Sequence, residues 1–317
     1  MIAIRPADFV CRYQANGFPN WIARLGRLRF TTDDLAHALF VTGRAPGDQT
    51  RYGQASYWEF VHRTSLIPAY LRRTSGGRLE RSPLAIDLDR SEKVALSYAL
   101  GQAMTSIFCE KVLNVSHLMH IDRYGQRYAM TFGATKKRAD LFGLSPAGWI
   151  IAEAKGRSNA MEPALEHQLM GQKRSVLSVG GAPPFLALGC VASFPPRSVG
   201  MRLDAFDPVD YEIEPIVLNV LDNQFYLAYY EPFIALLDMG EREDNGAYAM
   251  SEFRGLNLRV GLDHEIEQRI RGAMAGEEVG LASFIREYVI EASHFEGGFP
   301  DGSVVKTDWR KMLSLEH

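Results

Sequence analysis

The stretch RADLFGLSPAGWIIAEAKGR, residues 138–157, contains two apolar runs separated by a short Pro-Ala-Gly turn. Runs of this length and composition are typical of buried β-strands, and the turn between them predicts a hairpin. The second run nevertheless carries Glu153 and Lys155. Because successive strand residues point to opposite faces, these two side chains share a face with Trp149 and Ile151. Charges in such a position are unfavourable unless they are paired or bind a metal, so we expect partners for both.

A second carboxylate is expected beside them. Asp140 lies near the start of the first run, whereas Glu153 and Lys155 lie near the end of the second. Those two ends are neighbours in an antiparallel hairpin, so two carboxylates and an ammonium should meet at one edge of the sheet. Two carboxylates, with waters and a phosphate in the remaining positions, suit Mg²⁺. A lysine beside that ion can orient a water or stabilise charge on a scissile phosphate.

The sequence around the hairpin predicts a mixed α/β sheet. SEKVALSYALGQAMTSIFCEKVL has helical periodicity and a Ser and a Glu at its start. NVSHLMHID and RYAMTFG predict strands before the hairpin, AMEPALEHQLMGQKRSVLSV predicts a helix after it, and PPFLALGCVASF predicts a further strand. The expected order is therefore helix, strands, helix, strand.

These residues and elements together resemble the PD-(D/E)XK nuclease superfamily. The resemblance is carried by the AD motif that contains Asp140, by the EAK motif of Glu153 and Lys155, and by the order of elements over roughly residues 88–194. It implies a restriction-endonuclease-like core flanked by helices. It also implies that Asp140 and Glu153 bind Mg²⁺ (or Mn²⁺) and that Lys155 is the catalytic lysine.

The resemblance implies further site residues. Glu110, near the end of the first predicted helix, matches a glutamate that many members place at the metal, whereas Glu92 at its start is less well placed. Gln168 and Gln172 match a glutamine that helps to position substrate in some branches. The chain departs from the usual pattern because Ala139 stands where proline is common and because position 172 is not the tyrosine of RecB-like exonucleases. The subfamily therefore stays open.

Six basic residues and Gln172 lie near the predicted site in the sequence. They could hold the phosphate backbone of a nucleic acid, or they could form a solvated face. The basic residues are Lys136, Lys137, Arg138, Arg157, Lys173 and Arg174.

Charge is distributed unevenly along the chain. Residues 201–317 contain 10 Lys or Arg and 23 Asp or Glu, a net charge of −13, whereas residues 1–200 contain 25 and 15, a net charge of +10. The basic part suits a polyanion. The acidic part could be a surface for a homodimer or a regulatory protein, or simply a solvated domain.

Three regions follow from these patterns. Residues 1–85 predict a partly helical accessory region, residues 86–200 the nuclease-like core, and residues 201–317 an acidic, mainly helical C-terminal domain. The three cysteines have no close spacing, which favours a reducing compartment over a disulfide framework or zinc site. No apolar run approaches the roughly 20 residues of a membrane helix and no secretory signal is recognisable, so we expect a cytoplasmic protein that does not bind a membrane.

The expected function is that of a Mg²⁺-dependent endonuclease. By resemblance the substrate is DNA, and the setting is restriction or anti-phage defence, with DNA repair or a toxin role as other settings. The alternative is a non-catalytic module that binds nucleic acid or a partner protein on the same fold. In that case Glu153 and Lys155 form only a structural ion pair.

Overall fold

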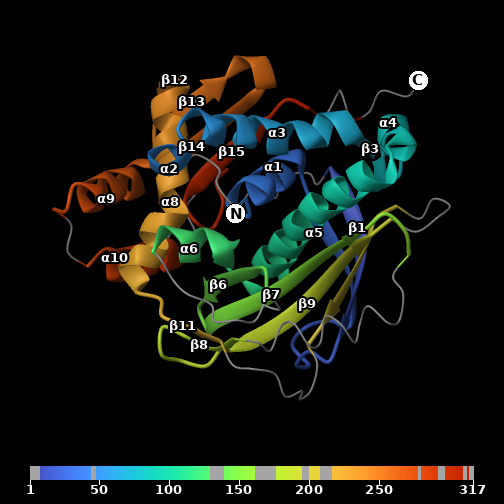
Figure 1. Ribbon diagram of the computed structural model, residues 1–317, viewed down its shortest axis with the longest axis horizontal. Coiled ribbons are helices and arrows are strands. Elements are labelled where there is room, and N and C mark those ends of the chain that lie inside the picture. The colour runs from blue at the N-terminus through green and yellow to red at the C-terminus, as the bar shows by residue number, and fades with distance from the viewer. Residues whose placement is uncertain are drawn as a thin grey trace.

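A computed structural model of the chain shows a mixed α/β fold around one curled seven-stranded sheet (Figure 1). The strands lie in the order β2 (Leu25–Phe30), β1 (Phe9–Asn16), β10 (Arg202–Phe206), β9 (Leu186–Ser193), β7 (Gly148–Arg157), β6 (Leu141–Ser145) and β5 (His117–His120). The structure describes residues 8–43, 48–128, 139–160, 176–194, 200–207, 216–277, 280–291, 297–309 and 313.

The predicted hairpin is confirmed as β6 and β7. These strands are antiparallel, with Leu141 opposite Ala152 and Ser145 opposite Gly148. Strand β5 pairs antiparallel with β6, and β7 pairs in parallel with β9. Because the sheet continues on both sides of the hairpin, β7 is a central strand, which explains its almost continuous apolar run.

The long predicted helix is confirmed as α5 (Arg90–Leu113). Its N-terminus is closed by a capping box, in which the Asp89 carboxylate accepts hydrogen bonds from the backbone N–H groups of Ser91 and Glu92. The Glu92 side chain in turn accepts from the backbone N–H of Asp89. The helix ends at Asn114, which adopts the left-handed conformation with φ 54°.

Helix α5 rests directly on β7, as Figure 1 shows. Two glycines allow this approach. A Cβ at Gly156 would lie 1.5 Å from the backbone oxygen of Ser97, and a Cβ at Gly101 would lie 2.5 Å from the backbone nitrogen of Gly156. One face of β7 therefore packs against the helix, and the odd-numbered residues of β7 point to the other face.

The sheet takes strands from all three regions expected from the sequence. Strand β10 pairs antiparallel with β9 and in parallel with β1, and β1 pairs antiparallel with β2. The boundaries expected near residues 85 and 200 therefore do not divide this sheet. The β1–β10 pair joins residues about 190 positions apart, as in Arg12 and Arg202, and such a pairing leaves no local pattern in the sequence.

The C-terminal region contains a sheet that the sequence did not predict. The expected helices are present as α8 (Asp222–Met239), α9 (His264–Met274) and α10 (Leu281–Glu291). Between and after them lie the antiparallel strands β12 (Glu241–Asn245), β13 (Tyr248–Phe253), β14 (Leu258–Asp263) and β15 (Ser303–Thr307). A turn precedes β15, in which the backbone N–H of Gly302 donates to the backbone oxygen of Phe299. Strand β15 pairs antiparallel with β14.

The other described elements lie around these two sheets or form two small two-stranded sheets. They are α1 (Thr32–Val41), α2 (Gln49–Tyr52), α3 (Gln54–Tyr70), β3 (Leu71–Arg73), β4 (Leu79–Arg81), α4 (Pro83–Asp87), α6 (Ile121–Arg127), β8 (Val176–Val179), β11 (Ile216–Leu218) and η1 (Arg254–Leu256). The small sheets are β3–β4 and β8–β11. None of the described helices is both long and apolar enough to cross a bilayer.

Two local predictions differ from the structure. The expected strand RYAMTFG begins at Arg127, but Arg127 is the last residue of α6, and most of the segment lies outside the described residues. The expected helix over 160–179 ends in strand β8 instead, and residues 161–175 lie outside the described residues. Residues 176–179 read VLSV, and their β-branched side chains suit a strand better than a helix.

Substitution of Gly156 tests the contact between α5 and β7. We expect Gly156→Ala to lower the free energy of unfolding by about 3 kcal/mol, because a Cβ there forces α5 and β7 apart. Urea denaturation measures this difference. Gly255→Ala is the matched control, since a Cβ at Gly255 meets nothing within 4 Å. Equal stability of the two variants would contradict the close contact.

Candidate functional site

The hairpin brings Asp140 to the end of β7. Asp140 directly precedes β6, and because Leu141 pairs with Ala152, Asp140 comes opposite Glu153. The backbone N–H of Ala154 donates to Asp140 Oδ2 at 3.1 Å. This bond fixes the Asp140 carboxylate beside the strand that carries the second carboxylate. The approach expected from the sequence is therefore present.

Glu153 is the buried member of the site. The residue is 1% exposed, and its Oε1 forms an ion pair with the ammonium of Lys155. Its other carboxylate oxygen, Oε2, is buried and has no hydrogen-bond partner among the described residues. A divalent cation takes oxygen ligands of this kind.

Burial and charge make Glu153 hard to ionise. Removal from water raises its pKa, the nearby charge of Asp140 raises it further, and Lys155 opposes both effects. The resulting pKa is about 7, well above the ordinary value. Lys155 itself is one-third exposed, so it links the buried carboxylate to the surface.

The alternation of β7 explains which side chains form this site. Ala154 is in register with Cys190 of β9, and Gly156 touches Ser97 of α5, so the even-numbered residues face the helix. Glu153 and Lys155 consequently point to the opposite face of the sheet. The helix excludes water from one side, and the charges lie on the other.

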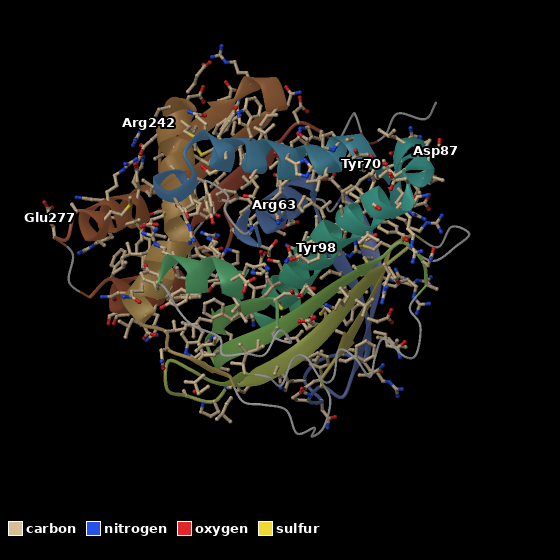
Figure 2. The ribbon with its side chains drawn as sticks, in the orientation of Figure 1. Arg63, Tyr70, Asp87, Tyr98, Arg242 and Glu277 are labelled. Carbon is tan, nitrogen blue, oxygen red and sulfur yellow. The ribbon has the colours of Figure 1, made fainter. Side chains whose placement is uncertain are left out.

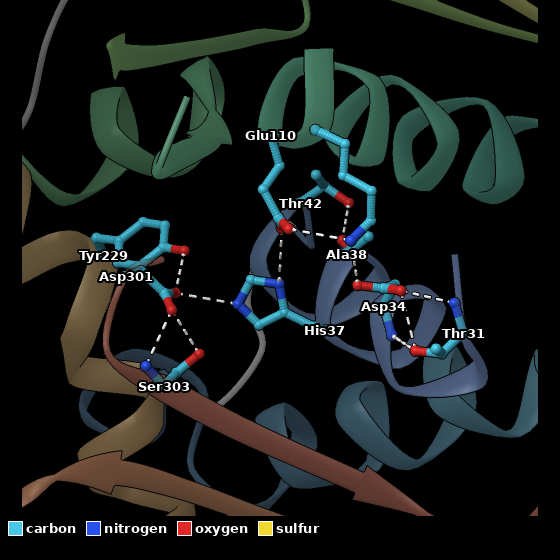
Figure 3. Close-up of polar contacts among 10 residues, drawn as sticks. Thr31, Asp34, His37, Ala38, Thr42, Glu110, Tyr229, Asp301 and Ser303 are labelled. Carbon is cyan, nitrogen blue, oxygen red and sulfur yellow. Dashed lines mark hydrogen bonds and ion pairs between the residues drawn. The ribbon is translucent and has the colours of Figure 1, made fainter. Parts of the chain in front are cut away.

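Glu110 belongs to a different cluster. It lies on α5, where its Oε2 is 4.0 Å from Nδ1 of His37 and its Oε1 is 3.5 Å from Nζ of Lys111 (Figure 3). The charges that shift its pKa are those of Lys111, Asp34, His37 and Asp301. The structure therefore joins Asp140, Glu153 and Lys155, but it gives Glu110 other partners.

We call the group of His37, Glu110, Lys111 and Asp301 the His37 cluster. It connects α1 and α5 to the turn before β15. His37 on α1 places Nε2 3.0 Å from Oδ2 of Asp301, in the turn before β15 (Figure 3). Asp301 also accepts from the hydroxyl of Tyr229 at 2.6 Å and from the backbone N–H and hydroxyl of Ser303. Sequence reasoning missed this pair, because 264 residues separate its members and no short motif marks them.

The charges in this cluster support one another. Burial raises the pKa of Asp301, but the His37 ring and the donated hydrogen bonds lower it more, so the pKa of that carboxyl falls well below its usual range. Burial lowers the pKa of His37, and the charge of Asp301 raises it above the ordinary value. Burial raises the pKa of Glu110 to about 7, against the charge of Lys111. These neighbours stabilise an imidazolium between two acidic groups.

Of the predicted basic residues, only Arg157 lies in the described part of the chain. It is exposed at the end of β7, two residues beyond Lys155. The other predicted positions lie outside the described residues. They are Lys136, Lys137, Arg138, Gln168, Gln172, Lys173 and Arg174.

The described residues offer a carboxylate pair and no larger metal-binding group. No set of three or more His, Cys, Asp or Glu side chains within the described ranges is arranged to hold a metal. Asp140 and Glu153 remain as candidate ligands, and Mg²⁺ is often bound by one or two carboxylates with substrate phosphates and waters. The three cysteines are buried and free. The chain matches no protein-family model, no curated protein and no solved structure.

The raised pKa of Glu153 predicts a dependence of stability on pH. A carboxyl whose folded pKa exceeds its unfolded value stabilises the fold below the unfolded pKa, and that stabilisation is lost as the pH rises through about 7. Relative to Glu153→Gln, the wild type should lose on the order of 2 kcal/mol of unfolding free energy between about pH 5 and about pH 8. Chemical denaturation at each pH measures the difference.

The control for this experiment is Glu277→Gln. Glu277 is exposed beyond α9, far from the seven-stranded sheet (Figure 2), so its removal should leave the pH profile unchanged. A profile of Glu153→Gln that runs parallel to the wild type would refute the raised pKa.

The His37 cluster yields a second prediction about stability. Asp301→Asn should cost about 3 kcal/mol of unfolding free energy at neutral pH, because it leaves the buried His37 without its charged partner. A carboxyl with a lowered folded pKa stabilises the fold above its unfolded pKa, so the cost should shrink as the pH falls below about 4. Thermal or urea unfolding measures it, with the exposed Asp308→Asn as control. A cost that does not depend on pH would contradict the ionised pair.

Proposed function

We propose that the chain is a Mg²⁺- or Mn²⁺-dependent nuclease that hydrolyses phosphodiester bonds. The observation that carries the proposal is the Glu153 carboxylate. It is 1% exposed, its Oε2 has no hydrogen-bond partner among the described residues, and it lies beside Asp140. A simple ion pair with Lys155 accounts for one oxygen and leaves the other buried at a cost. Groups with such a perturbed pKa are concentrated at functional sites.

The arrangement of elements around the site supports the same proposal. Helix α5 is followed by three antiparallel strands, β5, β6 and β7, and β9 returns beside β7 in parallel. This order agrees in part with that expected of a restriction-endonuclease-like core, because α6 lies between β5 and β6 and residues 161–175 of the expected second helix lie outside the described residues. The resemblance is a pattern in the sequence, whereas the burial of the Glu153 carboxylate is a property of the fold. The two observations therefore support the proposal in different ways.

Each residue has a role in the proposed reaction. Asp140 and Glu153 would hold the divalent ion, which when bound supplies a Lewis acid for the phosphate oxygens. Lys155 is positioned by its ion pair with Glu153 and has an ammonium near the surface. It would orient the attacking water and offset negative charge in the transition state. The buried setting strengthens each of these electrostatic interactions.

The substrate and setting follow from the family resemblance. DNA is the proposed substrate, endonucleolytic cutting the proposed mode, and restriction or anti-phage defence in the cytoplasm the proposed setting. A homodimer or a regulatory protein bound through residues 201–317 is a further proposal. It is not needed for the chemistry.

Cleavage assays on plasmid and linear DNA test the proposal. With Mg²⁺ or Mn²⁺ present, Lys155→Ala should cut about 100-fold more slowly than the wild type, because it removes charge stabilisation at the phosphate. Asp140→Asn should lose both cutting and metal binding, the latter measured by calorimetry. Lys306→Ala, in β15 of the other sheet, is the control and should cut normally.

Two outcomes would reject the nuclease. One is wild-type protein that binds neither Mg²⁺ nor Mn²⁺, which would favour the non-catalytic module. The other is a Lys155→Ala variant that cuts as fast as the wild type, which would place the chemistry elsewhere.

A further inference from the structure

Four arginines stand in line across the seven-stranded sheet. The register aligns Arg157 of β7 with Ser193 of β9, and Ser193 with Arg202 of β10. It then aligns Arg202 with Arg12 of β1, and Arg12 with Arg27 of β2. Residues in register on neighbouring strands share one face of a sheet. We call these four residues the arginine row.

The arginine row lies on the face that carries the candidate site. Arg157 is two positions beyond Lys155 on β7, so both side chains point to the same side. At the other end of the row, Tyr13 of β1 packs against Phe108 of α5. Its neighbour Arg12 therefore points away from the helix. The row and the site both lie opposite α5.

The row is exposed and bears charges of a single sign. All four arginines are exposed, whereas Ser193 between them is 1% exposed. Like charges directly opposite one another destabilise a sheet. Around Arg12, Arg27 and Arg202 the surface is hollowed into a cavity of about 430 Å³. An anion in that hollow would relieve the repulsion.

Two arginines of the C-terminal region provide a contrast. Arg254 pairs with Glu241 and Glu252, and Arg259 pairs with Glu252. Within the described ranges, no such ion pair is found for the four exposed arginines of the row. Among the described residues the row is therefore positive and unpaired, although Asp204 lies two residues beyond Arg202 on the same face of β10, whereas Arg254 and Arg259 are paired with glutamates.

We propose that the arginine row binds the phosphate backbone of a nucleic-acid strand and leads it to Asp140, Glu153 and Lys155. This proposal rests on the proposed nuclease function and specifies how its substrate is held. The guanidinium group suits the role, because its fork of donors binds phosphate oxygens in pairs. The contacts are to the backbone and require no particular base sequence.

The dimensions of the sheet fit such a strand. The row crosses five adjacent strands, so it is about 19 Å long at the usual spacing between strands. That length spans several phosphates of a nucleic-acid strand. Along β7, Arg157 lies about 7 Å from Lys155 at the usual rise per residue. A strand bound to the row would therefore reach the candidate site at its β7 end.

Binding without cleavage tests the row separately from the chemistry. Fluorescence anisotropy of the full chain with a labelled oligonucleotide, single-stranded or duplex, in EDTA measures affinity when no divalent ion is present. The double variant Arg12→Ala/Arg202→Ala should bind about tenfold more weakly, and the slope of log affinity against log salt should fall by about one for each arginine removed. The matched control is Arg254→Ala/Arg259→Ala, two arginines that are already paired, and it should bind normally. Circular dichroism checks that both variants fold.

The outcomes separate the row from the nuclease. Unchanged affinity and salt slope in Arg12→Ala/Arg202→Ala would overturn the row, even if the chain cuts DNA. Weakened binding of the oligonucleotide by the double variant, together with a wild type that binds neither Mg²⁺ nor Mn²⁺, would uphold the row and reject the nuclease. Failure of the wild type to bind any oligonucleotide would overturn the row. A double variant that still binds the oligonucleotide but no longer binds an acidic protein would also overturn it.

Discussion

The carboxylate of Glu153 is held almost wholly out of water inside a sheet, and the arrangement around it follows from that constraint. A buried carboxylate needs a cation or must take up a proton. Lys155 supplies one cation, two residues along the same strand. Asp140 supplies a second negative charge, which raises the pKa of Glu153. The two carboxylates together favour the binding of a further cation. Replacing a buried ion pair with well-packed apolar residues is often neutral or stabilising, so stability alone does not explain a charged pair at this position.

The neighbouring elements hold this arrangement in place. Close contact at Gly101 and Gly156 presses α5 onto one face of β7, which leaves the charges only the other face. The register of five strands then carries four arginines along that same face. The uneven distribution of charge along the chain thus corresponds to different surfaces of the fold. Exposed positive charge collects on the sheet, while acidic residues of the C-terminal region pair with arginines of that region.

The features predicted from the sequence are those that depend on residues close together in the chain. The hairpin of β6 and β7, the capped helix α5 and the approach of Asp140 to Glu153 all arise within short segments, where alternation and capping leave clear patterns. The completion of the sheet by β1, β2 and β10 depends on pairings between distant segments, so residues 1–85 and 201–317 were assigned to separate regions. The family resemblance implies a metal role for Glu110, but its contacts with His37 and Lys111 depend on how α1 packs against α5.

In the proposed nuclease, a divalent ion would compete with a proton for the Glu153 carboxylate. Carbon-detected NMR titration of its carboxyl, assigned by comparison with Glu153→Gln, tests this directly. Without metal the carboxyl should titrate near pH 7. With saturating Mg²⁺ the titration should move to lower pH, because the ion competes with the proton for the same oxygens. A titration curve that neither Mg²⁺ nor Mn²⁺ displaces would contradict the account and leave Glu153 as a buried structural group.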